Sequence, residues 1–264
     1  MSALIVIPAR YASTRYPGKP LVDLRGASGV KKSLIERSWD AAVSVKGDHQ
    51  IVVATDDARI RTACEAFGAD VVMTSETCRN GTERCAEAYE VLGSDADIVV
   101  NLQGDAPLTP PWFVEALIDA MASGVEVATP VLRCDAKAHA GFMEDRANGR
   151  VGGTTSVFDA QNRALYFSKE VIPYTGRTFT DTETCPVFHH VGVYAYTPKA
   201  LKAYPTWDEG HLEGWEGLEQ LRFMENGTPV HCVEVDARGR DFWELNNPVD
   251  VARIEAIMKE HGLD

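Results

Sequence analysis

The first half of the chain alternates between short apolar runs and longer segments in which apolar residues recur every three or four positions. Such runs are typical of strands buried on both faces, and such segments are typical of amphipathic helices. We expect strands at residues 4–8, 51–56, 70–74, 97–105 and 125–131. We expect helices at residues 33–43, 57–68, 81–93 and 109–121. The alternation predicts an α/β fold with a doubly wound, mostly parallel sheet that helices cover on both faces.

The second half of the chain is less regular. Strand-like runs lie at residues 153–158, 164–167, 191–196 and 230–235. Helical spacing predicts one helix over 212–227, with Trp215 on its inner side, and a terminal helix over 246–262. Residues 135–153 are polar and contain glycine, so we interpret them as a surface excursion.

The overall charge makes nucleic acid an unsuitable partner. The chain has 26 Lys and Arg residues against 39 Asp and Glu residues, a net charge of −13. Phosphate polymers require clustered cations, which an acidic chain lacks. Arg10, Arg15 and Lys19 stand against this charge in the loop after the first expected strand. Ligands of parallel sheets bind outside the carboxyl ends of the strands, so this loop predicts a small anion such as a nucleotide phosphate. The alternative is a solvated basic loop.

The cysteines and the apolar runs bear on the compartment. None of the six cysteines forms a C-x-x-C pair, which makes zinc and dithiol redox sites poor interpretations. We find no signal peptide at the start of the sequence and no apolar run near the roughly 20 residues that a membrane helix requires. We therefore expect a reduced, cytoplasmic protein without a membrane partner.

Three short motifs suggest chemistry. In "NLQGDAP" (101–107), Asp105 ends a strand at the carboxyl edge of the sheet, where it either binds a divalent metal or caps the next turn. In "RNGTER" (79–84), an Asn-Gly pair opens a helix, and Arg79 or Arg84 is a candidate to face a ligand. In "FHHVGVYAY" (188–196), His190 and Tyr194 share one face of a strand, either in the core or in a sugar pocket.

Together these segments resemble a known family. "IPARYASTRYPGKPLVD", "VVATDD", "NGTER", "NLQGD", "ALYFSKEVIPY", "HHVGVYAY" and "LEQLR" occur in the order found in 3-deoxy-manno-octulosonate cytidylyltransferases, the CMP-Kdo synthetases. The resemblance spans residues 3–258. It implies a nucleotide-diphospho-sugar transferase-like fold, a single domain over 1–264, and a lid or dimerisation sub-region at about 135–215. It also implies CTP and a small sugar-acid acceptor as substrates, Mg²⁺ as cofactor and a homodimer.

The resemblance also implies roles for individual residues. The CTP-binding residues are Arg10, Ser13, Arg15, Lys19, Arg79 and Gln103. The acceptor-binding residues are Lys169, His190, Tyr194, Glu219 and Gln220. Asp105 and Asn246 are the metal positions, and Arg10, Lys19 and Asp105 are the catalytic ones.

The sequence departs from the family pattern in four places. Ala106 replaces a Glu, Lys169 replaces an Arg, and Asn246 replaces a second metal-binding Asp. The segment after Gly26 is longer than usual. These departures leave the acceptor open between Kdo, an amino-Kdo, another sugar acid or a phosphonate. A catalytically impaired sugar-nucleotide-binding protein is the alternative from a different class.

Overall fold

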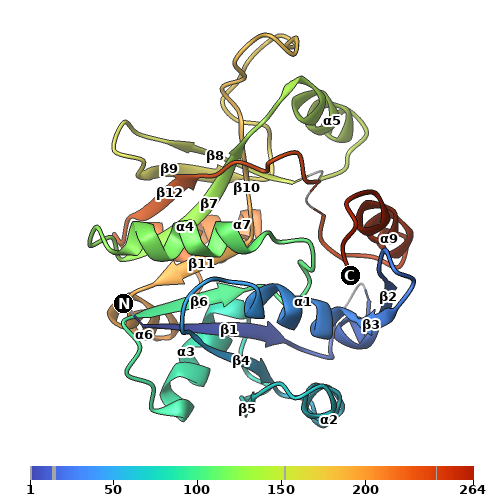
Figure 1. Cartoon of the computed structure of the whole chain (residues 1–264). Coiled ribbons are helices and arrows are strands. Elements are labelled where there is room, and N and C mark those ends of the chain that lie inside the picture. Colours follow the sequence, from blue (N-terminus) through green and yellow to red (C-terminus); the bar gives the residue numbers. More distant parts are fainter. Residues whose placement is uncertain (1, 14–15, 152, 242) are drawn as a thin grey trace.

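A computed structural model describes residues 2–13, 16–151, 153–241 and 243–264 (Figure 1). Across these residues a 10-stranded sheet runs in the order β5-β4-β1-β6-β11-β7-β10-β8-β9, with β12 paired to β7. Its strands are β1 (Ala3–Ala9), β4 (Gln50–Thr55), β5 (Val71–Met73), β6 (Ile98–Leu102), β7 (Val127–Arg133), β8 (Thr154–Phe158), β9 (Ala164–Ser168), β10 (Phe188–His190), β11 (Val193–Tyr196) and β12 (Val230–Glu234). The α/β prediction is confirmed.

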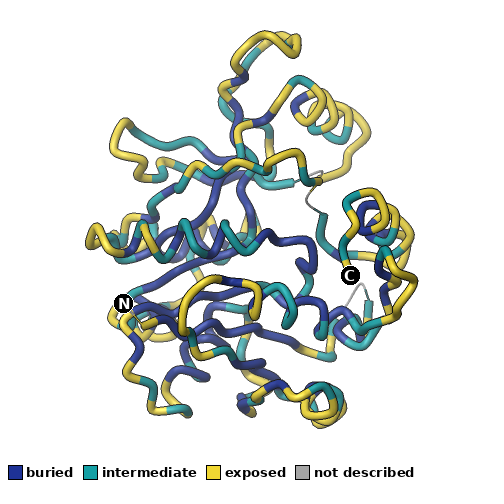
Figure 2. The backbone as a smooth tube through the Cα atoms, viewed as in Figure 1, coloured by how far each residue is buried: buried dark blue, intermediate teal, exposed yellow. Residues whose placement is uncertain are grey.

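The N-terminal half of this sheet is parallel. β1 lies between β4 and β6 and is parallel to both, and β5 is parallel to β4. All seven residues of β1 are buried, as expected for a strand with helices on both faces. Figure 2 shows β1 and β6 as buried along their whole length. The carboxyl ends of β1 and β6 therefore meet at the same sheet edge.

The other half of the sheet is mixed. β11 lies antiparallel between β6 and β7, although it follows them by more than 60 residues in the chain. β12 returns parallel to β7, and β10, β8 and β9 extend the sheet in antiparallel order. The strand predicted over 191–196 thus joins the parallel half of the sheet to the mixed half.

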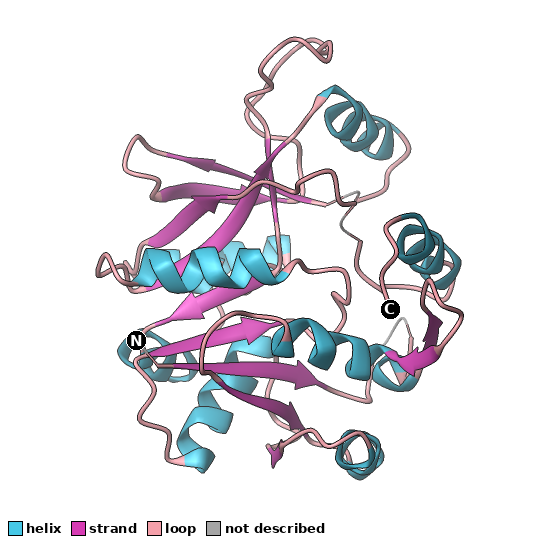
Figure 3. Cartoon of the chain, in the orientation of Figure 1, coloured by secondary structure: helices cyan, strands magenta, loops and turns pink. Residues whose placement is uncertain are grey.

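Helices cover both faces of the sheet (Figure 3). One apolar cluster joins β1 to α1 (Leu34–Val43), α2 (Ala58–Ala66) and α4 (Pro111–Met121). The cluster on the opposite face joins it to α3 (Gly81–Leu92), α6 (Pro198–Ala203) and α8 (Leu221–Glu225). Alternate β1 residues enter the two clusters, because side chains of a strand alternate between faces. The doubly wound arrangement follows from this pattern.

Two segments differ from the sequence-based expectation. Residues 135–153 contain a helix, α5 (Ala136–Ala147), which Asp135 caps through its side chain. The helix predicted over 212–227 is divided into α7 (His211–Glu216) and α8, because Gly217 adopts a left-handed conformation with φ of 62°. Trp215 was predicted to face inward, but its side chain is 81% exposed.

The segment after Gly26 connects β2 (Asp23–Arg25) to β3 (Lys31–Ser33), and these two strands form a small hairpin. The C-terminal helix α9 (Asp250–Glu260) packs against it, and Leu24, Leu34 and Ile254 are buried between them. Within the described residues, no helix has the length and apolar character to cross a membrane.

Candidate active site

A large cleft opens at the carboxyl ends of β1 and β6. Its volume is about 2010 Å³, and polar side chains from the loop after β1, the start of α3, α5 and the segment before α9 line it. Most of the candidate residues from the sequence line this one cleft: Arg10, Ser13, Lys19, Arg79, Gln103, Asp105, Lys169, His190, Tyr194, Glu219, Gln220 and Asn246. Arg15 lies outside the described residues.

The loop after β1 forms one end of the cleft. Gly18 has a φ of 72°, and its N–H donates to the carbonyl of Tyr11, which closes the loop. Lys19 follows in a short 3₁₀ turn, and its Nζ lies 2.7 Å from Oδ2 of Asp105. Arg10 and Ser13 line the same end. These residues form a cationic cradle of the kind that binds phosphate oxygens.

Gly104 allows the ends of β1 and β6 to approach closely. A Cβ atom at this position would lie 2.8 Å from the carbonyl oxygen of Pro8, which is too close for any other residue without a backbone shift. Ser38 of α1 donates to the carbonyl of Gly104. The two contacts fix the turn that carries Asp105 beside the loop after β1.

The segment before α9 reaches Asp105 from the other side. The N–H of Leu245 donates to the carbonyl of Asp105 over 2.9 Å, which places Glu244 and Asn246 near that turn. The side chain of Asn246 donates to Glu244 over 3.5 Å, and its backbone N–H donates to Asp250. Among the described residues, no group of three or more His, Cys, Asp or Glu side chains is placed to hold a metal.

This donor set fits Mg²⁺ that is shared with a ligand. Mg²⁺ prefers oxygen ligands and retains waters, so one or two carboxylates with substrate phosphates suffice. Asp105 and Glu244 provide carboxylates at the cleft, and Asn246 provides an amide oxygen. Lys19 pairs with Oδ2 of Asp105 over 2.7 Å.

The start of α3 forms part of the cleft wall. Asn80 caps the helix by accepting from the N–H of Glu83. Arg79 is half-exposed on the cleft and pairs with Glu83 over 2.6 Å, whereas Arg84 is buried and pairs with Asp56 over 2.7 Å. Of the two arginines considered in this motif, Arg79 has the exposure that a ligand contact requires.

His190 and Tyr194 lie together in the cleft wall. Their ring centroids are 5.6 Å apart, although the two residues belong to different strands, β10 and β11. The hydroxyl of Thr129 donates to the carbonyl of Val193 and so accepts from Nε2 of His190 over 2.9 Å. Burial and the neighbouring His189 lower the pKa of His190 to about 3. Burial also raises the pKa of Tyr194 well above its usual value. Both rings are uncharged at neutral pH.

The side-chain amide of Gln220, next to Tyr194, has a hydrogen-bond donor without a partner among the described residues. Tyr194 donates its hydroxyl to Oε1 of Gln220 over 3.0 Å, which fixes the orientation of the amide. Its Nε2 is buried and has no hydrogen-bond partner among the described residues. An unpaired buried donor is costly, so this atom indicates a place for a ligand oxygen.

Glu219 connects the turn after β6 to the start of α3. Its carboxylate accepts from Nε2 of Gln103 and from the N–H of Thr82, both over 3.0 Å. Burial raises the pKa of Glu219, and these hydrogen bonds offset the rise only in part. Lys169 lies beside Gly217, and its N–H donates to Glu216.

Sequence reasoning missed the contribution of α5. Lys137 and Phe142 of this helix and Arg150 after it line the cleft, and the ring of Phe142 packs against His189. The segment has too little apolar periodicity for a helix to be recognised. The only local signal is Asp135, a residue type that often caps helices.

The cytidylyltransferase family model matches residues 4–235. The chain is 44% identical to the 3-deoxy-manno-octulosonate cytidylyltransferase of Maricaulis maris (strain MCS10), and the match covers 99% of each protein. It is 38% identical to the mitochondrial 3-deoxy-manno-octulosonate cytidylyltransferase of Arabidopsis thaliana over 98% of this chain and 83% of that protein. It is 41% identical to the 8-amino-3,8-dideoxy-manno-octulosonate cytidylyltransferase of Shewanella pealeana (strain ATCC 700345 / ANG-SQ1), over 97% of this chain and 98% of that protein.

A solved structure has the same fold. The structure of a CMP:2-keto-3-deoxy-manno-octonic acid synthetase complexed with CTP superimposes with a TM-score of 0.83 at 34% identity. The match covers 99% of this chain and all of that one. The resemblance seen in the sequence motifs is confirmed over the whole fold.

Proposed function

The chain belongs to the cytidylyltransferase family, and on this premise we propose that it transfers CMP from CTP to the anomeric hydroxyl of 3-deoxy-manno-octulosonate (Kdo). Pyrophosphate is the second product. The observation that carries the acceptor assignment is the buried Nε2 of Gln220, which has no partner among the described residues and belongs to an amide that Tyr194 holds at the cleft. A sugar acid with several hydroxyl oxygens supplies the missing hydrogen-bond acceptor.

In this proposal the cleft holds the two substrates end to end. The triphosphate lies against Arg10, Ser13 and Lys19, with Arg15 in the same loop, and Gln103 and Arg79 contact the nucleotide. The acceptor lies against His190, Tyr194, Glu219 and Gln220. Lys169 supplies a charge for its carboxylate, as a compact ammonium rather than the fork of an arginine.

The reaction requires in-line attack of the anomeric oxygen on the α-phosphorus. A new P–O bond forms as the bond to the pyrophosphate oxygen breaks, the hydroxyl proton passes to water, and the leaving group carries the developing negative charge. Arg10 and Lys19 stabilise this charge, and the common cleft supplies the alignment of the reacting atoms. Asp105, with Asn246 or Glu244, would hold Mg²⁺, which neutralises phosphate charge when bound.

Three further features belong to this proposal. The protein acts in the cytoplasm, and it works as a homodimer. The sub-region at about 135–215 serves as lid and dimerisation region, which α5 on the cleft wall and the exposed Leu165 and Tyr174 support. Sedimentation equilibrium tests the dimer, which a mass near the 28.9 kDa of one chain would refute.

Pyrophosphate release from CTP tests the function. The purified protein is incubated with CTP and Mg²⁺, and with Kdo, 8-amino-3,8-dideoxy-manno-octulosonate or no acceptor. We expect release with Kdo and none without acceptor. A higher kcat/KM for the amino sugar than for Kdo would show that this chain prefers the substrate named for the Shewanella relative. CTP binding without release in any arm would support a binding protein instead.

A further inference from the structure

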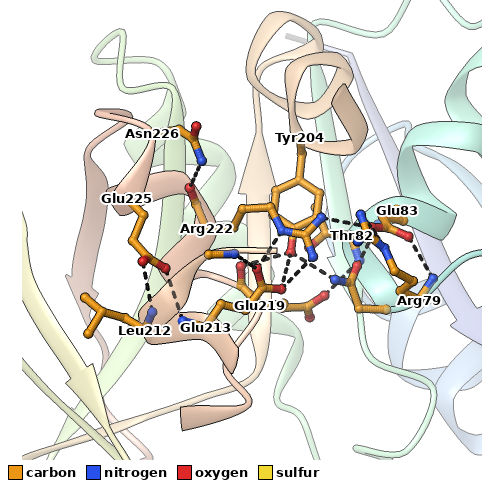
Figure 4. Close-up of polar contacts among 12 residues, drawn as sticks. Arg79, Thr82, Glu83, Tyr204, Leu212, Glu213, Glu219, Arg222, Glu225 and Asn226 are labelled. Atoms are coloured by element: carbon orange, nitrogen blue, oxygen red, sulfur yellow. Dashed lines mark hydrogen bonds and ion pairs between the residues drawn. The ribbon is translucent and has the colours of Figure 1, made fainter. Parts of the chain in front are cut away.

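Arg222 lies behind the cleft rather than in it. It stands in α8, its side chain is 1% exposed, and it is not among the described residues that line the cleft. Its guanidinium donates through Nε and Nη2 to the two carboxylate oxygens of Glu213, over 2.6 and 2.7 Å. Nη1 donates to Glu83 over 2.9 Å, and the group stacks over the ring of Tyr204 (Figure 4). One side chain thus joins α7, α8 and α3.

Glu83 links Arg222 to Arg79 on the cleft wall. The same oxygen, Oε1, accepts from Arg222 and from the half-exposed Arg79. Burial by itself would raise the pKa of Glu83, but the bonds from Arg79 and Arg222 hold it below its usual value. Glu83 therefore keeps a buried, permanently charged partner even when Arg79 contacts a ligand.

Residues of the proposed acceptor site are also held by contacts with the start of α3 and with Tyr204. Residues 217–220, here called the acceptor segment, lie between α7 and α8, which have six and five residues. Helices this short are not stable by themselves, so contacts elsewhere must hold the segment in place. Glu219 accepts from the N–H of Thr82 in α3, and its carbonyl accepts from the hydroxyl of Tyr204. Asn80 donates to that same hydroxyl.

We propose that Arg222 is a positioning residue that holds the acceptor segment in register with the start of α3, and so aligns the acceptor with the nucleotide. The inference rests on the proposed function, since it assigns the two substrates to these two elements. Arg222 touches neither substrate. It acts through Glu213 on one side and through Glu83 on the other.

The fork of an arginine is necessary for this role. A guanidinium makes two parallel bonds to one carboxylate and still presents a third N–H to another. A lysine retains the charge as a single point and cannot hold Glu213 and Glu83 in the same geometry. Arg222→Lys therefore removes the alignment while it leaves a buried cation with its two carboxylates.

Arg37→Lys is the matched control. Arg37 is also buried, but it donates to the carbonyls of Leu24 and Val30 at the β2–β3 hairpin, away from the cleft. Arg37→Lys also replaces a buried guanidinium by an ammonium and loses packing. The variant therefore measures how far a general loss of stability changes the kinetic constants. Glu213→Gln serves as a second test variant, which remains useful if Arg222→Lys does not fold.

Two measurements test the proposal on the full chain. In steady-state kinetics we expect Arg222→Lys and Glu213→Gln to raise the acceptor KM about tenfold or more, because small misplacements weaken aligned contacts strongly. The CTP dissociation constant, measured by calorimetry without acceptor, should stay at the wild-type value. Hydrogen exchange of the Thr82 amide should be faster in both variants, because Glu219 no longer holds it. Arg37→Lys should change neither the acceptor KM nor the exchange.

The two readouts separate the inference from the function on which it rests. Wild-type acceptor KM and wild-type Thr82 exchange in both test variants would overturn the role of Arg222. So would an equal rise in acceptor KM for Arg37→Lys. A wild-type protein that releases no pyrophosphate would refute the proposed function instead, and the exchange comparison would still report on the acceptor segment.

Discussion

At the scale of single residues, burial sets the protonation state of the groups that would meet the acceptor. His190 is buried against Phe167, Tyr194 and Thr129. Burial opposes protonation of its ring, and the neighbouring His189 opposes it further. The ring is therefore a neutral hydrogen-bonding group at physiological pH. A binding role for His190 in this site does not require it to gain or lose a proton.

The low pKa of His190 predicts a specific acid sensitivity. Its pKa is about 3 in the folded protein and about 6.5 when unfolded. Between these values the unfolded chain binds the extra proton, so the histidine's contribution is complete above pH 6.5 and is lost as the pH falls toward 3. Between pH 7 and 4.5, wild type should lose about 2 to 3 kcal/mol more unfolding free energy than His190→Gln.

Urea unfolding at the two pH values measures this difference. The carboxylates titrate alike in both proteins, so their contribution cancels in the comparison. Equal losses in wild type and His190→Gln would show that His190 does not carry the shift.

At the scale of elements, a glycine divides a helix and thereby forms part of the candidate site. Gly217 ends α7 in the left-handed region and turns the chain so that Glu219 and Gln220 face the cleft before α8 begins. A Cβ at this position would lie 2.9 Å from Nζ of Lys169. The break is therefore a requirement of the backbone, and a side chain added at Gly217 would also displace the end of Lys169.

Gly217→Ala should affect both stability and the acceptor. We expect a loss of about 1 kcal/mol from the left-handed backbone. We also expect a higher acceptor KM, because Lys169 must move. Gly68→Ala is the control, since Gly68 has a φ of 85° and its added Cβ would meet nothing within 4 Å. Urea unfolding and acceptor KM are measured for both. The same KM change in both variants would contradict the role assigned to Gly217.

At the scale of the whole molecule, the proposed metal site is assembled from two distant parts of the chain. Asp105 belongs to the turn after β6, and Glu244 and Asn246 belong to the segment that leads to α9. The bond from the N–H of Leu245 to the carbonyl of Asp105 brings them together. The C-terminal segment therefore closes the cleft as well as packing on the β2–β3 hairpin.

We expect a Mg²⁺ requirement that depends mainly on Asp105. Asp105→Asn should abolish turnover without unfolding the protein. Asn246→Asp should lower the half-saturating Mg²⁺ concentration about tenfold, because it restores a second carboxylate. Pyrophosphate release across a Mg²⁺ titration measures both effects. If Asn246→Asp has no effect and Glu244→Gln weakens the dependence, Glu244 is the second ligand. If neither matters and Asp105→Asn stays active, the site lies elsewhere.

Much of the fold and the candidate site can be predicted from local pattern. The expected runs match the strands β1, β4 and β6 and the helices between them. Burial on one or both faces of an element sets the spacing of its apolar residues, which can be recognised in the sequence. The cations after β1 and the carboxylate after β6 followed from the same reasoning, since strand ends of a parallel sheet share an edge. Strand alternation made His190 and Tyr194 candidates for a sugar pocket, whereas Lys169, Glu219 and Gln220 came from the family resemblance alone.

Other features arise only from contacts between distant residues. The helix α5 has no strong apolar stripe, and the chain at Gly217 meets Lys169, a residue far away in the sequence. Arg222 and Glu83 are 139 positions apart, and β11 enters the sheet between strands that precede it by more than 60 residues. Periodicity reports whether a segment has a buried face, but not which partner buries it. The sequence thus determined the elements and the cationic loop at the cleft, whereas tertiary packing decided how residues 217–220 are held against α3.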